Sequence, residues 1–276
     1  MIGRIAPFAF AVTLTLGACT AIGDPAYSAP TQPTQMASSQ QVETPDTILF
    51  VGNSYFYYND SLHNHVRYMV EAAGVLPPDK LTYKSATIGG AALADHPIEH
   101  LVDHRNLRVD EPFDVVILQD ISSAALSERG RERFARTVKS YAATVRATGA
   151  EPVLYMTHSY VPPNERASPD MTGQVARMYM EAGEANDLRV IPVGLAFAEA
   201  YRRRPNIRLH QTYDGSHPNL LGTYLAAATV FATLYGRSPV GSSYDYFGAV
   251  PAEDALFLQQ VAQDTVVAFE ANGGGK

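Results

Sequence analysis

The sequence predicts a three-layer α/β/α domain built on a mostly parallel central sheet. Short runs of purely apolar residues, such as VVIL at residues 115–118, recur along the chain. Longer segments with apolar residues at helical spacing alternate with these runs. A strand that is apolar throughout is buried on both faces, and helices between such strands make them parallel. The chain has 276 residues, 46% of them hydrophobic, which suits one such domain with a sizeable core.

Each expected element rests on a local pattern. Apolar runs predict buried strands at residues 47–51, 84–88, 115–118, 153–156 and 190–193, of which the second is the weakest candidate. Periodic apolar residues predict helices at residues 62–74, 127–149, 220–235 and 252–271. Ser127 is suited to cap the second helix and Gly149 to end it. These elements define a domain over residues 47–272, followed by a polar tail at residues 273–276 that we expect to be disordered.

The N-terminus has the pattern of an export signal. Arg4 precedes the apolar residues 5–16, a stretch too short to span a membrane and suited to the apolar region of a signal peptide. The tetrapeptide LGAC that ends at Cys19 resembles a bacterial lipobox, in which the cysteine is acylated and becomes the new N-terminus. Cys19 is the only cysteine, which excludes an internal disulfide. We therefore expect a signal peptide at residues 1–18 and lipidation of Cys19, with an ordinary signal peptide and a chance cysteine as the alternative.

Residues 19–46 are expected to tether the domain to a membrane. They are rich in Pro, Ser, Thr and Gln and have too few large apolar residues to fold. Thr20, rather than Asp, follows the cysteine, so the lipobox resemblance implies no retention at the inner membrane. The expected location is the outer membrane or periplasm, if the bacterium has two membranes, and the leaflet that carries the anchor is left open.

The composition excludes two classes of protein. The formal net charge is −7, so no basic surface for a nucleic acid is expected. No apolar run in residues 40–276 approaches the roughly 20 residues that a membrane-spanning helix needs. The sequence leaves the oligomeric state open.

Four polar or glycine-rich segments are expected to meet at one edge of the sheet. Three of them directly follow predicted strands, and the fourth precedes the last two helices. They are Gly52-Asn53-Ser54, Gly89-Gly90, Gln119-Asp120 and Asp214-Gly215-Ser216-His217. The carboxyl ends of parallel strands share one edge, where ligands bind in open α/β sheets. The sequence therefore predicts a functional site at this edge.

The residues in these segments have the chemistry of a serine hydrolase. Ser54 is a nucleophile that needs a base, and the imidazole of His217 is suited to that role near neutral pH. Asp214, three residues before His217, is suited to orient the ring and stabilise its charged form. An oxyanion formed during attack needs preplaced donors, for which we expect the backbone N–H of Ser54, an N–H of the Gly-Gly turn and the amide of Gln119.

The same segments resemble the conserved blocks of one hydrolase family. Residues 48–61, ILFVGNSYFYYNDS, resemble the first block of the SGNH/GDSL hydrolases, with Asn in place of the Asp of G-D-S. Residues 214–218, DGSHP, match the final D-x-x-H block. The resemblance implies a flavodoxin-like α/β/α fold, with Ser54 as nucleophile and Asp214 and His217 completing the triad. It implies no metal and no other cofactor.

The two middle blocks of this family are matched less closely. The resemblance places the glycine of the second block on Gly90. The third block, G-x-N-D, is absent, and Leu118-Gln119-Asp120 occupies its place. This tripeptide resembles the L-Q-E of a bacterial subgroup that also carries G-N-S, so Gln119 is the candidate for the third oxyanion donor. Each residue singled out also has a structural alternative, such as a turn, a cap or a strand-end amide.

Several functions remain open at this point. The favoured one is hydrolysis of short-acyl carboxylic esters through an acyl-enzyme, with O-acetylated carbohydrates as the expected substrates. Short-chain lipid esters and peptidoglycan O-acetyl groups are open alternatives. Acyl transfer by the same triad and a non-catalytic glycan-binding lipoprotein are the alternatives. A metal-dependent hydrolase using His96, His100 and His104 is disfavoured, because Pro97 interrupts their helical spacing and no H-E-x-x-H motif accompanies them.

Three further features are expected near the site. His158 follows a predicted strand and is a candidate for the pocket. Some of the aromatic residues 55–58 are expected to line the pocket, and at least two of them to lie in the core. The Pro-rich loop at residues 159–170 is expected to shape specificity.

Overall fold

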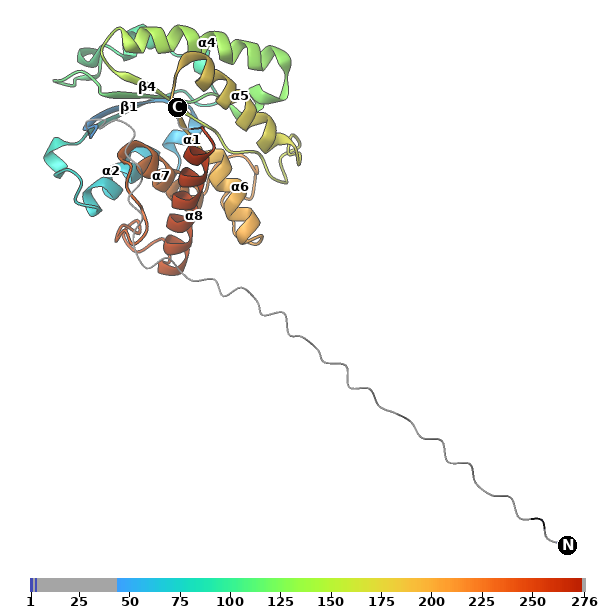
Figure 1. Cartoon of the computed structure of the whole chain (residues 1–276). Helices are drawn as coiled ribbons and strands as arrows, with labels where there is room; N and C mark the ends of the chain where they lie inside the picture. Colours follow the sequence, from blue (N-terminus) through green and yellow to red (C-terminus); the bar gives the residue numbers. More distant parts are fainter. Residues whose placement is uncertain (2, 4–43, 275–276) are drawn as a thin grey trace. The chain divides into compact units, whose positions relative to one another are not determined.

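The core of the protein is a parallel β-sheet (Figure 1). A computed structural model describes residues 1, 3 and 44–274, and the last of these ranges forms the domain. The strand order is β2-β1-β3-β4-β5. The strands are β1 (Thr47–Gly52), β2 (Thr82–Thr87), β3 (Val115–Leu118), β4 (Glu151–Tyr155) and β5 (Val190–Ile191). All four pairs of neighbouring strands are parallel, which confirms the predicted sheet.

Helices cover both faces of the sheet, and this confirms the predicted α/β/α layers (Figure 1). One face carries α2 (Leu62–Ala72), α6 (Val193–Arg203), α7 (Leu220–Tyr235) and α8 (Ala252–Ala271). The other face carries α3 (Ile98–Leu101), α4 (Glu128–Arg146) and α5 (Met171–Asn186). A short helix, α1 (Ser54–Tyr57), follows β1 almost directly. Four 3₁₀ helices lie at Pro78–Lys80, Leu93–Asp95, His104–Leu107 and Ser122–Leu126.

Strand β1 contributes to the cores on both faces. Ile48 and Phe50 are fully buried in the core beneath α2 and α7. Leu49 and Val51 are equally buried in the core beneath α4. Successive side chains of a strand point to opposite faces, so a central strand needs apolar residues at every position. This is why the run TILFV predicts the strand correctly.

Of the five strands, β3 alone has the predicted bounds; β1 extends to Gly52, and β4 spans Glu151–Tyr155 rather than residues 153–156. β2 and β5 also differ, for identifiable reasons. β2 begins at Thr82 rather than at residue 84, and most of its residues are only partly buried. It is an edge strand, so it carries polar residues and its apolar pattern is weak. β5 has only two residues, because Pro192 has no N–H to donate and Val193 already begins α6. Helices α5 and α6 have no counterpart in the prediction.

Helix α7 is apolar on nearly all sides because other elements surround it. It packs against α2, α6 and α8 and contributes many residues to the core. The side chain of Asn219 caps its start by accepting a hydrogen bond from the N–H of Gly222 at 3.0 Å. Gly236, with φ of 58°, ends it in the left-handed conformation. Among the described residues, no helix is both long enough and apolar enough to cross a membrane.

Part of the prediction for the N-terminus falls outside the described residues. Apart from residues 1, 3 and 44–46, the expected signal peptide, the lipidation site Cys19 and the linker are not described. Lipidation and export therefore stay predictions.

Candidate active site

The carboxyl edge of the sheet carries a serine, a histidine and an aspartate in hydrogen-bond contact. Ser54 Oγ lies 2.8 Å from His217 Nε2. On the other side of the ring, His217 Nδ1 lies 2.5 Å from Asp214 Oδ2. Ser54 and His217 are 163 residues apart in sequence, so only the fold brings them together. The arrangement is that of a nucleophile, a base and an orienting carboxylate.

Asn53 holds the serine in place at the end of β1. It has an extended backbone and caps α1, because its Oδ1 accepts a hydrogen bond from the N–H of Tyr55 at 3.2 Å. Its Nδ2 donates to the carbonyl of Ala91 at 3.1 Å, and this links the serine segment to the glycine turn. Ser54 is therefore the first residue of a helix whose start is fixed by two side-chain hydrogen bonds. The sequence motif did not reveal this capping role of Asn53.

The loop that carries the histidine is organised around the Asp214 carboxylate. Its Oδ1 accepts hydrogen bonds from the backbone N–H of Ser216 at 2.8 Å and of His217 at 3.1 Å. Burial raises the pKa of Asp214, but the hydrogen bonds from the His217 ring and from these two amides outweigh it. The net pKa lies below the ordinary value, so Asp214 is ionised at neutral pH.

Gly215 allows this loop to pack against the loop after β4. A Cβ at this position would lie 1.9 Å from the carbonyl oxygen of Val161, and the φ of 60° is left-handed. The carbonyl of Gly215 accepts a hydrogen bond from the N–H of Val161 at 2.8 Å. The side chain of Asn164 donates to the carbonyl of Asp214 at 3.1 Å. The loop predicted to shape specificity therefore also supports the Asp214–His217 segment.

Two of the three expected oxyanion donors have free backbone amides. Ser54 is the first residue of α1, and Gly90 is an exposed turn residue with φ of 70°. Within residues 44–274, neither N–H donates a hydrogen bond to another residue. The N–H of Ile88 donates to the carbonyl of Gly52 at 3.1 Å, which keeps the glycine turn beside the serine segment. Both amides are therefore available to a bound oxyanion.

The side chain of Gln119 makes its contacts inside the protein, and its expected role as the third donor stays a prediction. Its side chain is fully buried, and its Oε1 accepts a hydrogen bond from the N–H of Asn53 at 2.8 Å. Its Nε2 donates to the carbonyl of Asp120. Gly52 permits this approach, since a Cβ there would lie 2.2 Å from Gln119 Oε1. Gln119 therefore braces the segment that carries the nucleophile, because its oxygen accepts a hydrogen bond from the residue before Ser54.

Asp120 supports the other side of the glycine turn. Its Oδ1 accepts hydrogen bonds from the backbone N–H of Leu93 at 3.0 Å and of Ile121 at 2.8 Å. The residue is almost fully buried, and burial raises its pKa against the effect of these hydrogen bonds. The pair Gln119-Asp120 thus holds both segments that carry the free amides.

His158 lies behind the site rather than in an open pocket. It is buried, and its ring stacks on Tyr55 at 4.4 Å and on Phe197 at 4.3 Å between centroids. Its Nε2 lies 2.8 Å from the carbonyl of Ser216. Burial lowers the pKa of His158 well below its usual value, so the ring is neutral and donates through Nε2. Its contact with Ser216 makes it a support for the histidine loop.

The aromatic residues after Ser54 divide between core and site. Tyr55 and Phe56 are buried, whereas Tyr57 is exposed and Tyr58 partly so. The ring of Tyr58 stacks on the imidazole of His217 at 4.3 Å between centroids. Tyr213, 66% exposed, joins them through a contact of 3.1 Å between its hydroxyl and that of Tyr58. Tyr213 was missed in the sequence, although it directly precedes the D-x-x-H motif.

The three histidines considered for a metal site do not share a helix. His96 follows one 3₁₀ helix, His100 lies in α3, and His104 begins another 3₁₀ helix. His104 Nδ1 lies 2.7 Å from the carbonyl of Val109. Across the part of the chain that the structure describes, no three His, Cys, Asp or Glu side chains are gathered as metal ligands would be.

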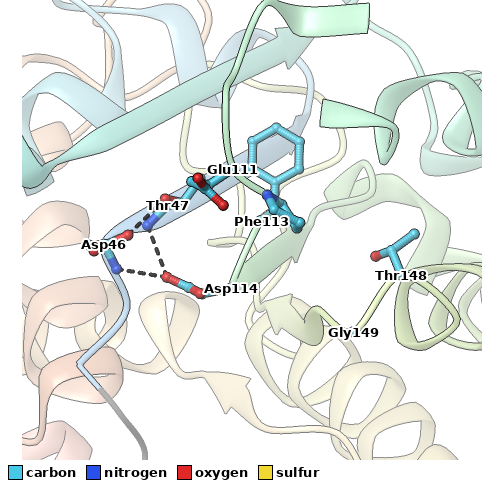
Figure 2. Close-up of a pocket in the computed structure, with 8 residues that line it drawn as sticks. Asp46, Thr47, Glu111, Phe113, Asp114, Thr148 and Gly149 are labelled. Carbon is cyan, nitrogen blue, oxygen red and sulfur yellow. Dashed lines mark hydrogen bonds between the residues drawn. The ribbon is translucent and has the colours of Figure 1, made fainter. Parts of the chain in front are cut away.

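A hollow lies at the opposite edge of the sheet (Figure 2). It has a volume of about 320 Å³ and is bordered by the residues that precede β3 and β4 and by the start of β1. Asp114 Oδ2 accepts hydrogen bonds there from the N–H of Asp46 at 2.9 Å and of Thr47 at 3.1 Å. The Asp114 carboxylate therefore satisfies backbone donors at the start of β1. The hollow contains none of the residues predicted for catalysis.

Comparison with known proteins identifies the fold. No protein-family model and no curated protein sequence matches the chain. A DUF4886 family protein from Bacteroides uniformis is similar in structure, with a TM-score of 0.64 and 18% identity over 80% of this chain and 94% of that chain. A protein from Slackia heliotrinireducens described as an SGNH hydrolase has a TM-score of 0.51 and 23% identity, over 67% and 96%. An acetyl xylan esterase has a TM-score of 0.53 and 15% identity, over 67% and 98%. The chain therefore has the fold of the SGNH/GDSL hydrolases, as predicted.

Proposed function

We propose that the protein is a serine esterase that hydrolyses short-acyl carboxylic esters through an acyl-enzyme. The observation that carries the proposal is the continuous contact from Ser54 Oγ through His217 to Asp214, at 2.8 Å and 2.5 Å. Nothing in a structural role requires these three side chains to be aligned in this way. The shared fold and the match to the first and last blocks of the SGNH/GDSL hydrolases support the same reaction.

In the first half of the reaction, Ser54 Oγ attacks the ester carbonyl while its proton passes to His217 Nε2. The carbonyl oxygen becomes an oxyanion, which the N–H groups of Ser54 and Gly90 stabilise. Asp214 stabilises the imidazolium through Nδ1. The intermediate then collapses to the acyl-enzyme, and the departing alkoxide takes the proton from His217.

In the second half, water replaces the alcohol. The oxygen of the water attacks the acyl carbon while His217 removes a proton from the water. The oxyanion then forms again. Collapse of the intermediate breaks the bond to Ser54 Oγ, which recovers a proton from His217 as the acid leaves. Acyl transfer would follow the same steps with an alcohol in place of water, and it is the alternative outcome for this triad.

O-acetylated carbohydrates are the proposed substrates. Tyr58 and Tyr213 present aromatic rings and hydroxyl groups beside His217, a combination suited to a sugar ring. The fold is shared with an acetyl xylan esterase. We further propose that lipidation of Cys19 holds the enzyme at a bacterial outer membrane, where exported or imported glycans pass.

Labelling with a fluorophosphonate separates an esterase from a glycan-binding protein with the same cleft. The wild-type chain should react covalently at Ser54, as located by peptide mass spectrometry. Ser54→Ala should abolish labelling and lower turnover of a nitrophenyl acetate about 10³-fold or more. Ser140→Ala is the matched control, because Ser140 is exposed on α4.

The outcomes of this experiment exclude one another. Labelling at Ser54 with hydrolysis of acetylated sugars supports the esterase. Unchanged turnover in Ser54→Ala refutes it. Binding of glycans without labelling of the wild-type chain would favour the binding protein.

A further inference from the structure

The imidazole of His217 lies against an aromatic ring from the helix that carries the nucleophile. Tyr58 and His217 stack with 4.3 Å between ring centroids and 12° between planes. Tyr58 ends α1, and its backbone N–H donates to the carbonyl of Ser54 at 3.2 Å. A single short helix therefore presents both the hydroxyl at the edge of the imidazole and the ring on its face.

We propose that Tyr58 is a positioning residue whose ring holds the His217 imidazole and stabilises the positive charge that it acquires from the Ser54 proton. The proposal rests on the esterase function above and assigns to this function a residue outside the triad. Tyr58 exchanges no proton and forms no bond during the reaction. In this role it acts through its contact with His217.

The physical basis is the charge distribution of an aromatic ring. The face of a tyrosine ring is electron-rich and attracts a cation within about 6 Å of its centroid. In the proposed reaction His217 gains a proton during the attack and is cationic in the intermediate, so the attraction is stronger in the intermediate. An interaction that strengthens along the reaction lowers the barrier, whereas one that is constant does not.

Other groups around His217 do not provide this stabilisation on the ring face. Asp214 and Ser54 meet the imidazole at its edge, through Nδ1 and Nε2. Tyr55 is perpendicular to it, with 5.9 Å between centroids. His158, whose positive charge would oppose that of His217, is kept neutral by burial.

Tyr58 itself stays uncharged while His217 changes charge. The hydrogen bond with Tyr213 and then burial raise the pKa of Tyr58 to about 12. The Tyr213 hydroxyl, 3.1 Å from that of Tyr58, also holds the ring in the plane that stacks on the imidazole. Asp214 and Tyr57 also raise the pKa of Tyr58, by a smaller amount. Tyr58 is thus a neutral aromatic face at every pH where the triad operates.

The test replaces the ring while leaving the triad intact. Tyr58→Leu removes the aromatic face, and Tyr58→Met is a second aliphatic variant with a longer side chain. Tyr58→Phe keeps the face and removes only the hydroxyl. Phe247→Leu is the matched control, because it removes an exposed aromatic ring that is not part of the site. For each variant, kcat/KM on a nitrophenyl acetate is measured against pH, and the His217 imidazole is titrated by NMR without substrate.

The aliphatic variants should lower kcat/KM about 3-fold to 30-fold, the range of a cation–π contact. The acidic limb of their pH profile should move to lower pH, because the cationic ring has lost a stabilising partner. The NMR titration of His217 should move the same way. Tyr58→Phe should stay closer to the wild-type chain than the aliphatic variants in both measurements, because it keeps the aromatic face. Phe247→Leu should equal the wild-type chain in both.

Two results would overturn the proposal. One is an unchanged rate in both aliphatic variants. The other is a lower rate with no movement of the acidic limb or of the NMR titration. A ring that only fills space would not stabilise the protonated imidazole of His217. The NMR titration needs no turnover, so it tests the stacking contact even if Ser54→Ala shows that the esterase proposal is wrong.

Discussion

A single carboxylate organises the histidine loop at the scale of residues. One oxygen of Asp214 contacts the imidazole, and the other accepts two backbone N–H groups of the same turn. The same hydrogen bonds that orient His217 also lower the pKa of Asp214. The carboxylate therefore contributes to folding as well as to the geometry of the base.

Replacement of Asp214 by Asn should change how stability depends on pH. A carboxyl group whose pKa is lower in the folded state stabilises the fold above its unfolded pKa of about 4, and this contribution is lost as the pH falls through the folded pKa. Asp214→Asn should therefore be less stable than the wild-type chain near pH 7, and the difference should shrink below pH 4. Urea unfolding at several pH values between 3 and 7 measures it. A difference that is constant with pH would contradict the lowered pKa.

The elements that matter most for the site are short connections at the ends of strands. Residues that follow β1 supply Ser54, those that follow β2 supply Gly90, and those that follow β3 supply the brace Gln119. The histidine loop is supported from the loop after β4, through Val161 and Gly215. Hydrogen bonds connect these segments to one another.

Gly215→Ala tests this dependence of the histidine loop on its neighbour. The new methyl group would overlap the carbonyl of Val161, and the left-handed backbone adds about 1 kcal/mol of strain. We expect kcat to fall at least about 10-fold, because small displacements of catalytic groups reduce rates strongly. Gly241→Ala is the control, since Gly241 also has a positive φ but nothing within 4 Å of the new Cβ. Equal activity of the two variants would show that packing of Gly215 is not required.

At the scale of the whole molecule, the carboxyl and amino edges of the sheet carry different sets of polar residues. The carboxyl edge carries the triad and the free amides. The amino edge carries Asp114, which pairs with the backbone of Asp46 and Thr47 beside the hollow in Figure 2. The length of the strands separates these two sets of residues, so changes at one edge leave the other in place.

Asp114→Ala should lower stability without changing catalysis. The change leaves two backbone N–H groups without their acceptor, which costs about 1 to 3 kcal/mol in the free energy of unfolding. The values of kcat and KM should equal those of the wild-type chain at temperatures where both are folded. Thermal unfolding and steady-state kinetics on the same preparations provide the two measurements. A loss of activity at full folding would mean that the edges are coupled.

The sequence by itself determined the central strands and the order of the layers, because a strand buried on both faces must be apolar throughout. It also determined the positions of Ser54, Asp214 and His217, since each lies in a short local motif. Edge strand β2 and the two-residue β5 were less well defined, because partial burial and Pro192 weaken their patterns.

The tertiary structure alone decided what surrounds those motifs. The side chain of Gln119 is buried, and its oxygen accepts a hydrogen bond from the N–H of Asn53, 66 positions earlier. Tyr58 and Tyr213 meet across 155 positions of sequence, and this contact holds a ring against the base. Such contacts depend on how distant segments pack. No local pattern of residue types encodes them.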